Sequence, residues 1–152
     1  MVTINEGITG DSAGLQELIS GLDVDAVGIA SLEEWKGAKL EESALKILPS
    51  ARSVVVLAME IYRETLTHVS PERIVGAASM NDLYARHGEY ISGRLTRAAY
   101  DVAKASHAQR LKALPLPGAG CPYNPRFVAA IFSFQHAGQT AGLEYIGKSS
   151  LL

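Results

Sequence analysis

The residues whose types and spacing most resemble a chemical motif lie in "GLEYIGKS", residues 142–149. Their pattern is G-x-x-x-x-G-K-S, the spacing of loops that cradle nucleotide phosphates. The residues that fit it are Gly142, Gly147, Lys148 and Ser149. A phosphate loop follows a buried strand, whereas the residues before Gly142 have a helical pattern, and bulky side chains occupy the loop interior. We therefore expect a glycine-capped helix and a turn here, and no nucleotide site.

Several other side chains have suitable chemistry for a site. The imidazole of His136 can donate a proton, contact a cofactor or bind a metal; it can equally cap a helix or pack on it. Lys148 and Ser149 can bind a phosphate- or carboxamide-bearing cofactor tail, or lie in solvent after a turn. Tyr84 and Tyr90 offer phenols as proton donors, or serve as core side chains with a solvated hydroxyl.

The single cysteine, Cys121, stands between turn-forming residues, and no histidine is placed by the sequence as its base. We expect it to be structural, because a reactive thiolate needs such a partner or a helix N-terminus. One thiol cannot supply the four thiolates of an iron–sulfur cluster, so no cluster is expected within the chain. His68, His87 and His107 share no metal-ligand spacing with a second ligand, and no metal site is predicted.

The first part of the chain contains four segments with clear patterns. Apolar residues at three-and-four spacing predict a helix over residues 11–22. Residues 26–30 predict a strand, in which Gly28 indicates that a neighbouring segment approaches closely. A helix then ends at Pro49, and the β-branched run at 53–59 is the best strand candidate in the chain.

The second part is dominated by one long helix. Residues 64–80 show no sustained period, and a helix of about 25 residues is predicted from Asn81. The proline-rich segment 114–126 predicts a loop. Residues 127–133 fit either a strand or the first turns of a helix; from Phe134 the helix is favoured, and Gly142 can take the left-handed cap.

The composition is that of an ordinary globular chain. With 152 residues we expect a single domain over 1–152. The formal net charge of −2 gives no electrostatic footprint for nucleic acid. No stretch approaches the apolar length of a membrane span and no leader is visible, so we expect a cytoplasmic protein with no membrane partner.

Four blocks of the sequence together resemble one family. The last block, "FSFQHAGQTAGLEYIGKSSLL", is similar to the segment S-x-K-x-A-x-x-A-G-L-G-W-I-G-K-x-x-L-L of cobalamin-dependent, iron–sulfur-containing reductases related to epoxyqueuosine reductase and the reductive dehalogenases. "DAVGIASLE" and "ILPSARSVVVLAM" resemble two early strands of that family, and "YARHGEYISGRL" resembles the turn into its long helix. Gln135 stands where the family has lysine, and Glu144 where it has glycine.

The resemblance implies an α+β fold, a nitroreductase-like sheet flanked by helices that binds a corrinoid. In the family a ferredoxin-like iron–sulfur module follows this domain; it is absent from these residues, so an electron-donating iron–sulfur protein or module is an implied partner. The motif implies cofactor contacts from Ser133, His136, Gly142, Gly147, Lys148 and Ser149. The family's acidic proton donor has no counterpart in "FVAAIFS", so the resemblance does not extend to epoxyqueuosine reduction itself.

Our expectation is therefore the cofactor-binding domain of a corrinoid-dependent reductase-like protein, with its electron-transfer module missing. Its catalytic residue is unassigned, with His136, Tyr84 and Tyr90 as candidates. One alternative is a non-catalytic domain of the same fold that dimerises or binds a partner through the strand that "SSLL" starts. The other is a reductase-like domain that uses FMN, which rests on analogy of fold.

Overall fold

The computed structural model describes residues 2–4, 13–64, 77–118, 123–124, 129–130 and 132–143. Its main sheet has four antiparallel strands in the order β2-β3-β1-β4. The strands are β1 (Val2–Ile4), β2 (Ala26–Ser31), β3 (Ser53–Ala58) and β4 (Ala113–Pro115). A second, two-stranded sheet pairs β5 (Tyr123–Asn124) with β6 (Ala129–Ala130). The chain is thus of the α+β class.

Strand β3 forms the centre of the fold, as its β-branched run predicted. Its residues from Ser53 to Leu57 are all buried, because helices cover both faces of the sheet. Side chains alternate along a strand, so Val54 and Val56 enter one core and Val55 and Leu57 enter the other.

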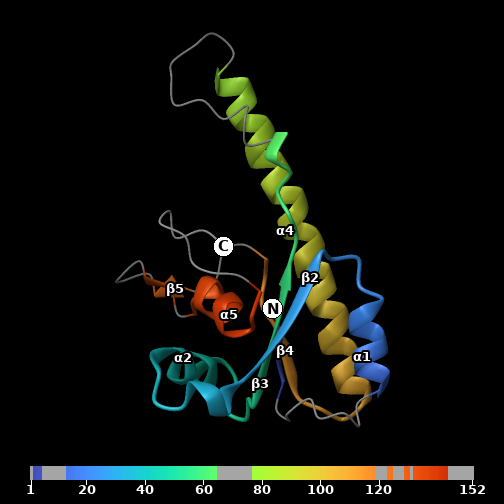
Figure 1. Cartoon of the computed structure of the whole chain (residues 1–152), viewed down its shortest axis with the longest axis vertical. Coiled ribbons are helices and arrows are strands. Elements are labelled where there is room, and N and C mark those ends of the chain that lie inside the picture. Colours follow the sequence, from blue (N-terminus) through green and yellow to red (C-terminus); the bar gives the residue numbers. More distant parts are fainter. Residues whose placement is uncertain are drawn as a thin grey trace.

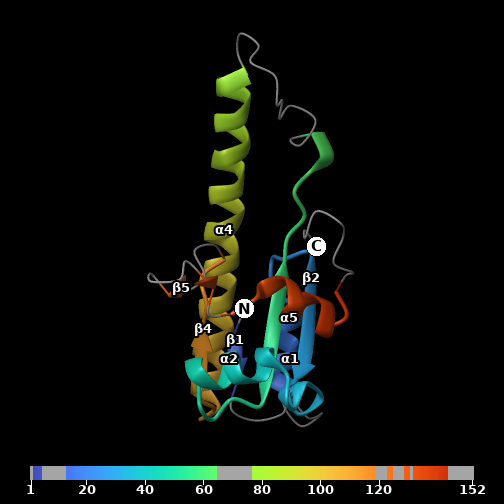
Figure 2. The same cartoon turned by 90° about the vertical axis from the view of Figure 1, so that its left-hand side faces the viewer.

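The first core lies on the side of the sheet covered by η1 (Leu32–Trp35), α2 (Lys39–Ile47) and α5 (Phe134–Thr140). We call it the α5 side. Trp35 and Phe132 are its largest buried side chains, and Ala44 and Ala137 bring α2 and α5 against them. Figures 1 and 2 show α2 and α5 together on this side of the sheet.

The second core, on the α4 side, packs α1 (Ala13–Ser20) and α4 (Ala77–Ala108) against the sheet. Its buried residues on α4 are small, namely Ala98, Ala99, Val102 and Ala103, so the helix lies close to β3 and β4. His107, in the last turn of α4, places its Nε2 2.9 Å from the carbonyl oxygen of Ala113. This contact fixes β4 to the end of the helix.

Helix α4 is far longer than the sheet that it covers. It has 32 residues, which corresponds to a length of about 48 Å at the α-helical rise. In Figures 1 and 2 its C-terminal half lies along the sheet, while its N-terminal half extends past the end of the strands. Tyr62, from the segment after β3, contacts His87 in the extended half, with ring centroids 6.3 Å apart.

Several predicted boundaries need correction. The long helix begins at Ala77, ahead of the predicted start at Asn81, and ends at Ala108. The prediction of a loop over residues 114–126 was wrong at both ends, since Leu114 and Pro115 belong to β4 and residues 123–124 form β5. Pro115 is tolerated because β4 is the outermost described strand, where one side of the backbone has no strand partner among the described residues. The short β1 was not predicted.

Candidate cofactor-binding site at helix α5

Helix α5 is fixed at both ends by its own capping residues. Ser133 is the N-cap, and its Oγ accepts a hydrogen bond from the backbone N–H of His136 at 3.4 Å. At the other end Gly142 has a φ of +74°, the left-handed conformation expected for it. The N–H of Gly142 donates to the carbonyl of Gln139 and that of Leu143 to the carbonyl of Gly138, the bonding pattern of a Schellman cap.

The cap of α5 rests directly on strand β2 at Gly28. A Cβ atom built on Gly28 would lie 2.7 Å from the carbonyl oxygen of Ala141 and 2.9 Å from Cγ of Leu143. Only glycine allows this approach without displacing backbone atoms. The prediction that Gly28 marks a close neighbour is confirmed, and the neighbour is the turn that begins the glycine motif.

The side chains of Ser133 and His136 form a pair at the start of α5. Ser133 Oγ lies 2.7 Å from His136 Nδ1, which is a normal hydrogen-bond distance. This bond sets the orientation of the ring, because one imidazole nitrogen is engaged and the other, Nε2, is left to interact elsewhere. His136 is exposed, and Nε2 has no hydrogen bond to another described residue.

Such a pair can perform two kinds of chemistry. If Nδ1–H donates to Ser133 Oγ, then Nε2 carries the lone pair that binds a metal centre or accepts a proton. If the Ser133 hydroxyl donates to Nδ1, then Nε2 carries a proton that can be donated to a ligand. In both states the reactive nitrogen is the exposed one.

The structure describes only some of the other predicted site residues. Gly147, Lys148 and Ser149 lie outside the described residues, and so does Cys121, which was expected to be structural. Tyr84 and Tyr90 are on α4, which covers the opposite face of the sheet from α5. Ser133 and His136 therefore lie together at the start of α5, Gly142 follows the C-cap at its other end, and both tyrosines are on α4.

Of the candidate tyrosines, Tyr90 is 62% exposed, and the guanidinium of Arg94 lies 5.7 Å from its ring centroid. Tyr84 is half-buried. His87, beside Tyr62, has a buried Nε2 without a hydrogen-bond partner in the described structure. Within these described ranges no three or more His, Cys, Asp or Glu side chains gather as a metal site would require.

One surface feature was missed from the sequence, a groove of about 1170 Å³ between α1 and α4. It lies on the α4 side, away from α5, and Leu18 and Ala98 are among its apolar lining residues. Arg94 and Asp23 both line the groove and form an ion pair. The hydrogen bond from Arg94 to the Asp23 carboxylate raises the pKa of the guanidinium. No local pattern reveals the groove, because it needs two helices that are distant in the sequence.

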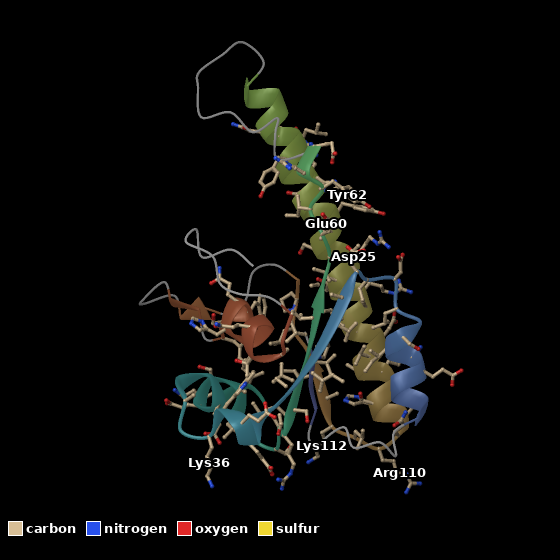
Figure 3. The ribbon with its side chains drawn as sticks, in the orientation of Figure 1. Asp25, Lys36, Glu60, Tyr62, Arg110 and Lys112 are labelled. Atoms are coloured by element: carbon tan, nitrogen blue, oxygen red, sulfur yellow. The ribbon has the colours of Figure 1, made fainter. Side chains whose placement is uncertain are left out.

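Figure 3 distinguishes the two ends of the sheet. Asp25, Glu60 and Tyr62 lie at the end from which α4 extends, whereas Lys36, Arg110 and Lys112 lie at the other. Asp25 Oδ2 accepts a hydrogen bond of 2.7 Å from the backbone N–H of Glu60, which ties the start of β2 to the segment after β3.

The fold and the α5 site define an α+β domain with an exposed, oriented imidazole beside a glycine-capped turn. Comparison with known proteins gives no match of the chain to a family model, to a curated protein or to a solved structure. None of the helices in the described part of the chain has the length and apolar character needed to cross a membrane.

Proposed function

We propose that this chain is the cofactor-binding domain of a corrinoid-dependent reductase-like protein with a nitroreductase-like fold, which receives electrons from a separate iron–sulfur protein or module. The observation that carries the proposal is the contact of Gly28 with Ala141 and Leu143. It joins the "DAVGIASLE" and "AGLEYIGK" blocks, which lie near opposite ends of the sequence. The "SARSVVVLA" strand pairs with the first of them, so three blocks of the resemblance form one unit.

The described residues of α5 fit a corrinoid in their donor chemistry. A corrinoid supplies a redox-active cobalt, and an imidazole nitrogen is a good ligand for such a metal. His136 offers Nε2 on the surface, and Ser133 holds the other ring nitrogen, as outer-shell partners of ligating histidines do. His136 would contact the cofactor, Ser133 would orient the ring, and Gly142 would keep the turn close to the helix end.

A titration with hydroxocobalamin tests this assignment. Hydroxocobalamin is added to the purified chain while its visible spectrum and the emission of the single tryptophan, Trp35, are followed. We expect a saturable spectral change and quenching of Trp35, which is buried on the α5 side. His136→Ala should weaken binding at least about tenfold, the equivalent of one lost ligand contact of about 1.4 kcal/mol.

The matched control is Gln139→Ala, an exposed position on the same helix. It should bind as the unchanged chain does. Absence of any spectral change with the unchanged protein would overturn the proposal. A parallel titration with FMN distinguishes the flavin alternative, which would give a saturable change with FMN and none with hydroxocobalamin.

A further inference from the structure

Strand β2 forms one margin of the main sheet, and its outer side has no strand partner among the described residues. Figure 2 shows β2 at this margin and β4 at the other. Strand β4 has three residues and contains Pro115, and both features protect a sheet edge from pairing. Strand β2 has six residues and contains neither proline nor lysine. Its edge is therefore the less protected of the two.

The bonding of β2 to β3 fixes which backbone groups face outward. Leu32, which directly follows β2, donates its N–H to the carbonyl of Arg52 at 2.8 Å, in the register of the two strands. Because bonded positions alternate along an antiparallel ladder, Val27 and Ile29 direct their N–H and C=O groups away from β3. No hydrogen bond in the described structure engages these outward groups. Their complement is another extended backbone.

The side chains beside this edge are apolar. Ile29 is 43% exposed. A hollow of about 290 Å³ lies between α1 and β2, and Ile19, Leu22, Val27 and Ile29 are among its lining residues. Directly opposed residues on neighbouring strands share a face of the sheet. A strand added at this edge would therefore bring every second side chain beside the hollow.

The start of β2 is acidic. Asp25 and Glu60 are both exposed, and a hydrogen bond joins the Asp25 carboxylate to the backbone of Glu60 (Figure 3). Neither side chain belongs to an ion pair of the described structure. A lysine or arginine near the end of an added strand would lie beside these carboxylates, where opposite charges are favourable.

A second copy of the chain lacks this cation. Only residues with outward backbone groups can bond to one another, so the antiparallel self-pairings with the most overlap are centred on Gly28 and on Ile29. They place Asp25 opposite Ser31 and opposite Glu33 of the second copy, respectively. Neither residue is a cation, whereas a strand from another protein can carry one.

We propose that the outer edge of β2 binds an extended segment of another protein as an added antiparallel strand. The segment alternates apolar residues, which lie beside Val27 and Ile29, with residues that face the other side of the sheet. It carries a lysine or arginine beside Asp25. Backbone hydrogen bonds to Val27 and Ile29 provide the affinity, and the hollow and the carboxylates select the sequence.

Three capped peptides test this pairing, each labelled with fluorescein and followed by fluorescence anisotropy as the full chain is added. Lys-Thr-Val-Thr-Val-Thr-Lys should bind in a saturable way, with a dissociation constant below about 0.5 mM. The same peptide with N-methyl groups on both valines lacks the N–H donors that would bond to β2. It should bind at least about tenfold more weakly, and so should the peptide with glutamate in place of both lysines.

A pair of variants tests the edge from the side of the chain. Val27→Pro removes one outward N–H and breaks no hydrogen bond to β3, because proline is tolerated where a strand has no partner. Val27→Ala is the matched control, since it also shortens the side chain but keeps the N–H. Val27→Pro should bind the lysine peptide at least about tenfold more weakly than Val27→Ala. Urea unfolding checks that both variants are folded, and the N-methylated peptide tests the same bonds without altering the chain.

Three results would overturn the proposal. One is the absence of saturable binding by the lysine peptide. Another is equal affinity for the lysine peptide and either of the other two peptides. The third is self-association of the chain that Val27→Pro abolishes, because it would identify a second copy as the occupant of the edge.

Discussion

Replacement of Gly28 by alanine probes the contact that joins the two ends of the sequence. The added Cβ would lie 2.7 Å from the carbonyl oxygen of Ala141 and 2.8 Å from its Cβ. The first obstacle is backbone, so a side-chain rotation cannot relieve it. Overpacking of this kind costs about 1–3 kcal/mol, against which alanine in a strand gains about 0.5–1 kcal/mol over glycine. Because the nearest atom is backbone, we take the upper part of the overpacking range, about 2–3 kcal/mol, and expect a net loss of about 1–2 kcal/mol in the free energy of unfolding.

Urea unfolding followed by Trp35 emission measures this loss, since the indole is buried in the same core as Ala137. With an m-value of about 2 kcal/mol/M, the midpoint should fall by about 0.5–1 M. Gly88→Ala is the control: it adds the same methyl group inside a helix, where no other described residue lies within 4 Å of the new Cβ, and it should raise the stability by about 1 kcal/mol.

A second change locates the strain more closely. Ala141→Gly in the Gly28→Ala background removes the contact between the two Cβ atoms but leaves the carbonyl oxygen in place. The double variant should therefore recover only part of the stability that Gly28→Ala loses. If Gly28→Ala is as stable as the unchanged chain, the cap of α5 does not lie on β2 and the reasoning is refuted.

Three further substitutions test the supports of the site and of the sheet, each by urea unfolding. Gly142 has a left-handed φ, so Gly142→Ala should lower the free energy of unfolding by about 1–2 kcal/mol. Gly142→Asn should lower it less, because asparagine tolerates that conformation. Equal losses for the two variants would argue against the cap. Ser133 caps α5, so Ser133→Ala should lower the free energy of unfolding by about 1 kcal/mol. Ser133→Asp can still cap the helix, so its stability should be close to that of the unchanged chain. His107 contacts the backbone of Ala113. Loss of this contact in His107→Ala should lower the free energy of unfolding by about 1–2 kcal/mol. An unchanged urea midpoint would show that the contact is not stabilising.

The parts of the fold that follow from local pattern were predicted well. The β-branched run of β3, the helix stopped before Pro49 and the glycine cap of α5 each depend on residues adjacent in sequence. Gly28 was also informative, because a glycine inside a strand signals a close neighbour although it does not say which.

The parts that depend on pairing between distant residues were missed. Strands β1 and β4 are too short to show a period, and they exist because they pair with each other and, in the case of β1, with β3. Ser133, the hydrogen-bond partner of His136, was also missed, because the sequence was searched only for the spacing of metal ligands and catalytic residues. It could have been found from helix capping, because the step from Ser133 to His136 is that from an N-cap to the N3 position.

The central claim is that the exposed nitrogen of His136 meets the cofactor. The most direct measurement is the nuclear magnetic resonance spectrum of the histidine rings, recorded on the full chain during titration with hydroxocobalamin. We predict that the His136 ring signals shift in a saturable way, while those of His107, which is engaged with Ala113 on the other side of the sheet, stay unchanged. Unchanged His136 signals at a saturating concentration of hydroxocobalamin would contradict the claim.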